Sequence, residues 1–349
     1  MRGTHDSARE ASKITVKAWA DGGIDRVDTG KQDGGMNLSV VIPSYRSEHW
    51  VGRAIRAARD EGVPASQIIV VEDGRFDATA QVVQREGARL ISLERNGGAP
   101  HARNLGLAAV ATDYVMFLDA DDYVENGLLA GLVQALDRDR SDVAIGPWVY
   151  DGDGRGRGVL RQPPQLDNAE RIFHWLLHAF FPPCCIAWRT ASIRALGGWD
   201  ERLKKDQDGE LMIRALIRDL RVSVTDTGNG VYWQHDSPHR VTRAQIHDVM
   251  HAADIVFAQL EQWVRSRSQR GQPNPYEPAL GRVCCKTAWV AFAHGENAIG
   301  ERWSARARAY GFGDKGYNAR SSLLAAFFGI RLSSLIKARS TMYRRVAQR

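Results

Sequence analysis

The sequence predicts an α/β fold with a mostly parallel sheet flanked by helices, followed by a helical C-terminal extension. From about residue 38 to residue 118, short apolar runs of strand length alternate with amphipathic segments of helical period. Strands separated by helices of this length pair in parallel, and the helices then cover both faces of the sheet. From about residue 241 onward the apolar residues follow a mainly helical period, with a loop expected at 271–278.

The elements of the N-terminal half follow one another without long gaps. Residues 38–43 (LSVVIP) have the composition of a buried strand, and residues 50–58 have helical spacing. The next expected elements are a strand at 68–71, a helix at 77–86, a strand at 89–93, a helix at 99–109 and a strand at 114–118. Beyond residue 141 the alternation is weaker, and we expect a strand at 143–150 and a helix at 167–178.

The composition is that of an ordinary globular protein, with 44% hydrophobic and 25% charged residues among 349. No apolar run reaches the length of a membrane span, and no secretory signal is readable at the N-terminus. We therefore expect a cytoplasmic protein, peripheral at the inner face of the membrane if its C-terminal region binds lipid. The four cysteines form two adjacent pairs, 184–185 and 284–285, whose spacing fits no zinc site, so we expect reduced core residues.

Polar loops follow three of the predicted strands, at residues 43–46, 72–74 and 119–122. Ligands of open parallel sheets bind where such loops meet, at the carboxyl ends of the strands. Asp119 and Asp121 directly follow the apolar strand at 114–118, and carboxylates held in this way suit a hard divalent cation such as Mg²⁺ or Mn²⁺. An isolated Asp-x-Asp triplet is also common as a turn or a helix cap.

Four segments in order give this triplet a context. They are SVVIPSY at 39–45, IVVEDG at 69–74, NGGAPHARNLG at 96–106 and FLDADD at 117–122, and GGWDE at 197–201 is a fifth. In order and spacing they resemble the successive signatures of the family-2 glycosyltransferases. The resemblance implies the GT-A fold and inverting, metal-dependent transfer of a sugar from a nucleotide-diphosphate donor. A UDP-sugar is the leading donor, and the implied acceptor is a hydroxyl of a saccharide or a lipid-linked glycan.

The same resemblance implies roles for individual residues where the letters agree. The nucleotide-binding residues would be Asp73 at the base edge, Pro43 and Tyr45 around the base, Asp119 at the ribose and Arg103 nearby. Asp121 would hold the metal, Mn²⁺ or Mg²⁺. Physically, a carboxylate accepts hydrogen bonds from a base, and a metal neutralises the diphosphate that must leave.

Two later segments complete the implied site. In DQDGEL at 206–211, alignment on Leu211 and Arg214 makes Asp208 the catalytic base that removes the acceptor proton. Without the resemblance, Asp208 would be interpreted as a helix N-cap. In VYWQHDS at 231–237, His235 matches a histidine that often completes the metal shell, the alternative being a structural or surface histidine.

Three positions depart from the family pattern. Arg46 stands where Asn is usual, Glu72 where Asp is common, and Gln207 where Glu is usual. Arg46 and Gln207 favour an alternative, a degenerate nucleotide-binding protein without catalysis.

The chain is expected to divide into parts. Residues 1–36, rich in Gly, Asp, Lys and Ser without a sustained apolar period, would be a flexible leader or an expression remnant. The resemblance implies a GT-A domain at 37–240, with a nucleotide-binding half at 37–145 and an acceptor-binding half at 146–240. Residues 241–349 would be a helical, basic region. Its last part, 301–349, carries eleven Lys or Arg against Glu301 and Asp314, and apolar residues recur near helical spacing at 323–336. This favours a second alternative, an adaptor that binds an anionic membrane surface or another polyanion. Nucleic acid is not an expected partner, since no nucleic-acid-binding module accompanies the charge.

Overall fold

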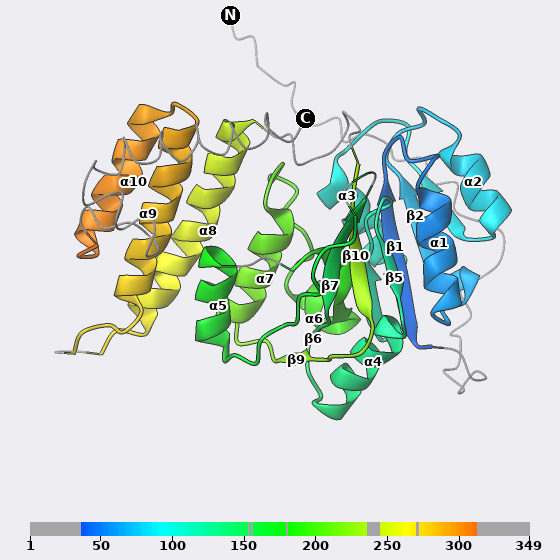
Figure 1. Cartoon of the computed structure of the whole chain (residues 1–349), viewed down its shortest axis with the longest axis horizontal. Coiled ribbons are helices and arrows are strands. Elements are labelled where there is room, and N and C mark those ends of the chain that lie inside the picture. The colour runs from blue at the N-terminus through cyan, green and yellow to red at the C-terminus, as the bar shows by residue number, and fades with distance from the viewer. Residues whose placement is uncertain are drawn as a thin grey trace, which may run out of the picture. The chain divides into compact units, whose positions relative to one another are not determined.

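The computed structural model describes residues 36–152, 154, 156–178, 181–235, 245–269 and 272–312 (Figure 1). The expected leader, apart from Met36, and the expected basic amphipathic segment at 323–336 lie outside these residues. The membrane or polyanion alternative therefore stays a prediction. Within the part of the chain that is described, no helix is long and apolar enough to cross a bilayer.

A seven-stranded sheet forms the centre of the fold (Figure 1). Its strands, in spatial order, are β3 (Arg89–Ser92), β2 (Ile68–Glu72), β1 (Leu38–Ser44), β4 (Tyr114–Phe117), β8 (Ile186–Arg189), β6 (Val143–Ile145) and β9 (Val222–Val224). The first four are parallel, whereas β8 runs antiparallel to both of its neighbours. The chain builds outward from β1 to β3 and then returns to β4 on the other side of β1, so the switch point of the sheet lies between β1 and β4. The prediction of a mostly parallel α/β sheet is confirmed.

Helices cover both faces of this sheet because alternate residues of its strands are apolar on either side. Val40 and Ile42 pack in one cluster with α1 (Val51–Asp60), α2 (Thr79–Glu86) and α4 (Leu128–Arg138). Val41 faces the other cluster, with α3 (Ala99–Ala108). A Cβ at Gly106 of α3 would lie 2.3 Å from Val41, so only glycine lets α3 approach β1 this closely. This contact fixes the helix that carries Arg103.

A second sheet contains β5 (Tyr123–Glu125), β10 (Asn229–Gln234) and β7 (Trp148–Gly152), in that order. The expectation of one strand at 143–150 was wrong, because the segment forms β6 and β7 in different sheets. The break falls at Gly146 and Pro147, and proline has no N–H to donate to a continued ladder. The chain therefore passes at this point from the central sheet, through β6, to the second sheet, through β7.

The remaining helices continue the same core. They are α5 (Asn168–Leu177), α6 (Thr190–Ala195), α7 (Gln207–Ile217), α8 (Ile246–Ser266), α9 (Glu277–Ala293) and α10 (Asn297–Ala309), with short 3₁₀ turns at Ala65–Gln67 and Pro183–Cys185. Buried side chains of α8, α9 and α10, such as Phe257, Trp289 and Trp303, belong to the same hydrophobic cluster as Val41 of the central sheet. The helical C-terminal extension is thus confirmed as far as residue 312, and its described helices pack into the same core as the central sheet. All four cysteines are free and buried, as expected.

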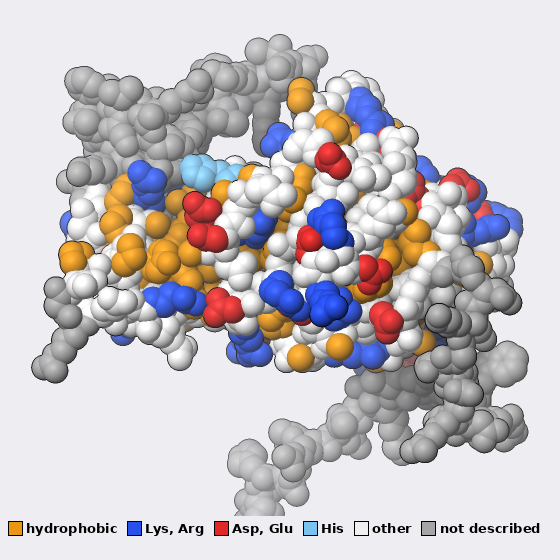
Figure 2. Space-filling view, turned by 90° about the horizontal axis from the view of Figure 1, so that it is seen from below, with side chains coloured by type: hydrophobic (Ala, Val, Ile, Leu, Met, Phe, Trp, Pro, Cys, Tyr) orange, Lys and Arg blue, Asp and Glu red, His pale blue; other side chains and the backbone are white. Residues whose placement is uncertain are grey.

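The face shown in Figure 2 carries Lys and Arg side chains beside Asp and Glu. Hydrophobic side chains gather toward the C-terminal helices, on the left of that view.

Candidate active site

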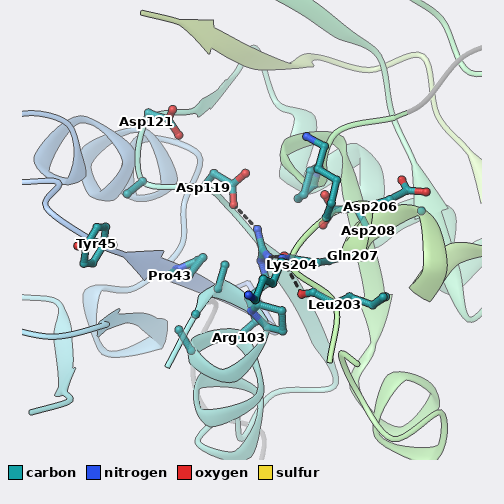
Figure 3. A pocket seen from close by; sticks show the side chains of 18 of the residues that line it. Pro43, Tyr45, Arg103, Asp119, Asp121, Leu203, Lys204, Asp206, Gln207 and Asp208 are labelled. Atoms are coloured by element: carbon teal, nitrogen blue, oxygen red, sulfur yellow. Dashed lines mark hydrogen bonds and ion pairs between the residues drawn. The ribbon is translucent and has the colours of Figure 1, made fainter. Parts of the chain in front are cut away.

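One cleft opens at the carboxyl ends of β1, β2 and β4, with a volume of about 1190 Å³. All eight residues predicted for the site line it: Pro43, Tyr45, Asp73, Arg103, Asp119, Asp121, Asp208 and His235. Figure 3 shows Tyr45 and Asp121 on one side, Asp206 and Asp208 on the other, and Arg103 with Asp119 between them. The residues that the sequence motifs suggested, from 43 to 235 along the chain, therefore share one site.

Arg103 connects the two sides of the cleft. Its guanidinium donates to Asp119 Oδ1 at 2.6 Å and to Gln207 Oε1 at 3.0 Å, and it lies over the Trp199 ring at 4.5 Å. Arg103 is only 4% exposed. Burial alone would lower the pKa of Arg103, but the carboxylates of Asp119 and Asp208 raise it above its ordinary value. Arg103 is therefore a fixed cation at the centre of the site, and the uncharged Gln207 still serves as its partner.

Replacing Arg103 should destabilise the fold far more than replacing a surface arginine. In Arg103→Met, Asp119 and Gln207 lose their buried donor, and we expect the free energy of unfolding to fall by about 2–4 kcal/mol. Arg202→Met is the matched control, since Arg202 makes a similar pair with Asp200 on the surface. It should lower the free energy of unfolding far less in the same urea titration, because solvent screens an exposed ion pair. Equal losses in both variants would contradict the buried role of Arg103.

Asp121 and His235 form the second group. His235 Nε2 lies 2.8 Å from Asp121 Oδ2, although the two residues come from the loop after β4 and the end of β10. The His235 side chain is 7% exposed, and its imidazole stacks on the Trp50 ring, with ring centroids 4.7 Å apart. A carboxylate oxygen and an imidazole nitrogen that converge in this way suit Mn²⁺, and Mg²⁺ less well.

The loop that carries Asp121 is fixed by hydrogen bonds to β10 and α1. Asp122 accepts from the Trp233 amide at 2.8 Å, and Arg53 donates to the Asp121 carbonyl at 2.6 Å. Among the described residues no group of three or more His, Cys, Asp or Glu side chains is placed to hold a metal. The described part of the chain thus offers two converging ligands, and a bound cation would take others from substrate oxygens and water, as Mg²⁺ commonly does.

Asp73 has a structural task that its motif does not reveal. Its two carboxylate oxygens accept from the amides of Gly97 and Gly98, at 2.6 and 2.8 Å. Gly98 has φ of 91°, a conformation that favours glycine, and it directly precedes α3. Asp73 therefore fixes the loop that leads to Arg103, and its predicted contact with the base would use the lone pairs that these amides leave.

Asp208 lies in the first turn of α7, across the cleft from Asp121 (Figure 3). Its Oδ1 is buried and has no hydrogen-bond partner. Burial raises the pKa of Asp208 to about 6, with Asp119 and Asp206 adding to the effect and Arg103 opposing it. The alternative role as a helix cap is not seen, since the N-cap of α7 is Asp206 and makes no side-chain cap bond. A buried, unpaired carboxylate with a raised pKa is suited to accept a proton.

Arg46, the departure in the first loop, has φ of 51° and lies over two aromatic rings. Its guanidinium is 5.6 Å from the Tyr45 ring centroid and 5.2 Å from that of Phe76. The two rings meet edge to face at 5.4 Å. Arg46 thus extends an aromatic and cationic surface next to Tyr45.

Sequence reasoning missed several other residues that line the cleft. They are Tyr150 of β7, Trp175 of α5, Asp206 before α7, Tyr232 of β10 and Lys286 of α9. One signal was available, because Lys286 interrupts an apolar helical stretch after two cysteines. The others carried no local signal, since they meet only through the tertiary fold.

A mostly parallel sheet whose switch point opens on a cleft lined by Asp119, Asp121, Asp208 and His235 has the architecture of the GT-A fold. The chain belongs to glycosyl transferase family 2, whose pattern matches residues 39–197. It is 30% identical over 256 residues to the succinoglycan biosynthesis protein ExoO of Rhizobium meliloti, covering 67% of this chain and 73% of that protein.

A further relative and two solved structures are similar to much of this chain. Poly(ribitol-phosphate) beta-N-acetylglucosaminyltransferase TarS of Staphylococcus aureus is 27% identical over 248 residues, which cover 65% of this chain and 42% of TarS. The structure of TarS residues 1–349 in complex with UDP-GlcNAc matches with a TM-score of 0.56 at 19% identity, over 89% of this chain and 92% of that one. The mannosyltransferase PcManGT of Pyrobaculum calidifontis, solved with GDP-Man and Mn²⁺, matches with a TM-score of 0.50 at 16% identity, over 88% and 87%. These structures share the fold.

Proposed function

We propose that this chain is an inverting glycosyltransferase that moves a sugar from a nucleotide-diphosphate donor to an acceptor hydroxyl with the help of a divalent cation. The observation that carries the proposal is one cleft with the Asp121–His235 pair on one side and Asp208, unpaired and with a raised pKa, on the other. The first group suits a diphosphate, and the second suits proton removal from an acceptor.

The reaction assigns each residue a task. Asp208 accepts the proton of the acceptor hydroxyl, whose oxygen forms a bond to the anomeric carbon while the bond from that carbon to the diphosphate oxygen breaks. Attack from the face opposite the diphosphate inverts the anomeric centre. Arg103 holds Asp119 and Gln207 in place and contributes a buried positive charge near the leaving group.

Asp121 and His235 would hold Mn²⁺ or Mg²⁺. When bound, the cation would neutralise charge on the departing diphosphate. The PcManGT structure with GDP-Man and Mn²⁺ supports this choice for a chain of the same fold.

A UDP-sugar is the proposed donor, with Pro43, Tyr45 and Asp73 at the base and Asp119 at the ribose. Support comes from the TarS structure with UDP-GlcNAc, whereas GDP-Man in PcManGT keeps a guanosine donor as the competing choice. The proposed acceptor is a saccharide or a lipid-linked glycan, as the role of ExoO in succinoglycan biosynthesis favours. The chain spans about two fifths of TarS, so the activity of that whole protein is not transferred to it.

A panel of nucleotide sugars with Mn²⁺ tests the proposal. Thermal stabilisation identifies the donor that binds, and release of nucleoside diphosphate shows whether it is turned over. A donor that binds without any transfer or hydrolysis would favour the non-catalytic alternative. No stabilisation by any nucleotide sugar would overturn the proposal.

The pH dependence of transfer should report Asp208. Its pKa is raised to about 6, so the carboxylate is ionised above that pH and protonated below it. A protonated carboxyl cannot take the acceptor proton, so kcat/KM should fall about tenfold per pH unit below about pH 6 and level off above it. A profile that stays flat down to about pH 4, the ordinary range of an aspartate, would contradict the assignment.

A further inference from the structure

Asp206, two residues before the proposed base, has an unusual backbone conformation. Its φ is 54° and its ψ is 32°, in the left-handed region that non-glycine residues seldom adopt. The carboxylate rests against Gly209, where an added Cβ would lie 2.4 Å from Asp206 Oδ1. The glycine and the backbone twist together direct this side chain, and strained residues of this kind occur at functional sites.

The Asp206 carboxylate has free hydrogen-bonding capacity. It makes no hydrogen bond or ion pair within the described ranges of the chain, and it is exposed to the cleft that it lines. The side chain is exposed to the cleft, but the protein around it keeps much of the solvent away. This desolvation raises the pKa of Asp206 to about 6, while Lys205 and Lys286 act to lower it. Next to it, the buried Oδ1 of Asp208 is also without a partner. These two carboxylates therefore have hydrogen-bond acceptors to offer a ligand.

The cleft that Asp206 lines also contains a cation and aromatic rings. Lys286 of α9 donates to the Leu176 carbonyl of α5 at 2.6 Å, which places it at the edge of the same cleft. Tyr150 and Tyr232 are paired in register on β7 and β10, with ring centroids 5.6 Å apart, and both line the cleft. Carboxylate, ammonium and phenol groups together suit a ligand rich in hydroxyls, which needs hydrogen bonds at its edge and apolar contact at its C–H face.

We propose that Asp206 is the positioning residue for the acceptor, and that its carboxylate accepts hydrogen bonds from hydroxyls of an uncharged sugar or polyol beside Asp208. The inference rests on the proposed function and deepens it. An anionic acceptor group in contact with both carboxylates would be repelled by Asp206 and Asp208, and Lys205 and Lys286 would offset only part of that repulsion. When Asp206 binds one or two hydroxyls of the acceptor, a neighbouring hydroxyl of the same molecule would lie next to Asp208, which would take its proton.

The test is the binding of simple sugars to the full chain with UDP and Mn²⁺, measured by saturation-transfer NMR with glucose, N-acetylglucosamine and ribitol as probes. Asp206→Gly keeps the left-handed backbone and removes the carboxylate, and Asp206→Asn fits the same conformation and removes only the charge. The matched control is Asp219→Asn. Asp219 lies just beyond the other end of α7 with φ of 56° and pairs with Arg267 on the surface.

We expect Asp206→Gly to raise the dissociation constant of at least one probe about tenfold or more, Asp206→Asn to raise it less, and Asp219→Asn to leave it unchanged. The melting temperature without sugar should stay near that of the wild type in Asp219→Asn, and near or above it in the two Asp206 variants, because the pKa of Asp206 is raised to about 6. The proposal is wrong if the wild type binds no probe, or if either Asp206 variant binds the probes as tightly as the wild type does. Asp206-dependent sugar binding by a chain that turns over no nucleotide sugar would instead overturn the proposed function alone.

Discussion

An Asp208→Asn enzyme should bind its nucleotide donor as the wild type does and transfer the sugar at least about a hundredfold more slowly, the scale of general-base catalysis. The amide has nearly the shape of the carboxylate but cannot accept the acceptor proton. Donor binding should survive because Asp208 lies across the cleft from Asp121 and Tyr45 (Figure 3). Steady-state transfer and donor affinity by calorimetry give the two readouts.

Loss of folding would not explain this result. The pKa of Asp208 is about 6 in the folded chain, above its ordinary 3.8, so keeping the group ionised costs stability as the pH rises through that range. The neutral amide removes that cost, and the melting temperature near neutral pH should be equal to or above that of the wild type. Asp219→Asn, at the other end of α7, is the control with full activity. Unchanged turnover in Asp208→Asn would refute the base assignment.

Asp121→Ala should abolish the effect of Mn²⁺ on nucleotide binding. In the wild type we expect Mn²⁺ to tighten UDP binding about tenfold or more, because the cation links the protein to the diphosphate. With Asp121 removed, His235 is the remaining ligand of the pair, and one imidazole is a weak site for a hard cation. Calorimetric titration of UDP with and without Mn²⁺ measures the difference.

Asp139→Ala is the control for that experiment. Asp139 pairs with Arg138 on the surface after α4 and lies outside the cleft. This variant should keep the full dependence on Mn²⁺. A persistent tightening of UDP binding by Mn²⁺ in Asp121→Ala would show that the cation is held elsewhere.

The parallel half of the fold and its site were predictable because they rest on local signals. Each of β1, β2 and β4 is a short apolar run, and each ends in the polar residues that line the cleft, such as Tyr45, Asp73 and Asp121. Parallel pairing then requires those strand ends to meet at one edge. The motifs added His235 and Asp208, which lie far along the chain.

The other half depends on contacts between distant segments. Strand β8, inserted antiparallel between β4 and β6, has four residues, too few for a periodic signal. The change of sheet at Pro147 depends on pairing with strands far along the chain, since β6 pairs with β8 and β9 and β7 pairs with β10. Asp73 binds the amides of Gly97 and Gly98 only because two loops meet, and Asp206 owes its direction to a φ that no pattern of residue types encodes.

The contact of α9 with the cleft has a consequence for how such enzymes diverge. Lys286 lies about eighty residues beyond the proposed base. It is in α9, and Trp289 of the same helix is buried in the hydrophobic cluster that includes residues of the central sheet. A chimera joined between α7 and α8 would combine the proposed base, Asp208 of α7, from one enzyme with the part of the cleft formed by α9 from another. Changes of acceptor preference among relatives can therefore originate in helices that lie outside the matched pattern at 39–197, where comparison of signature motifs does not reach.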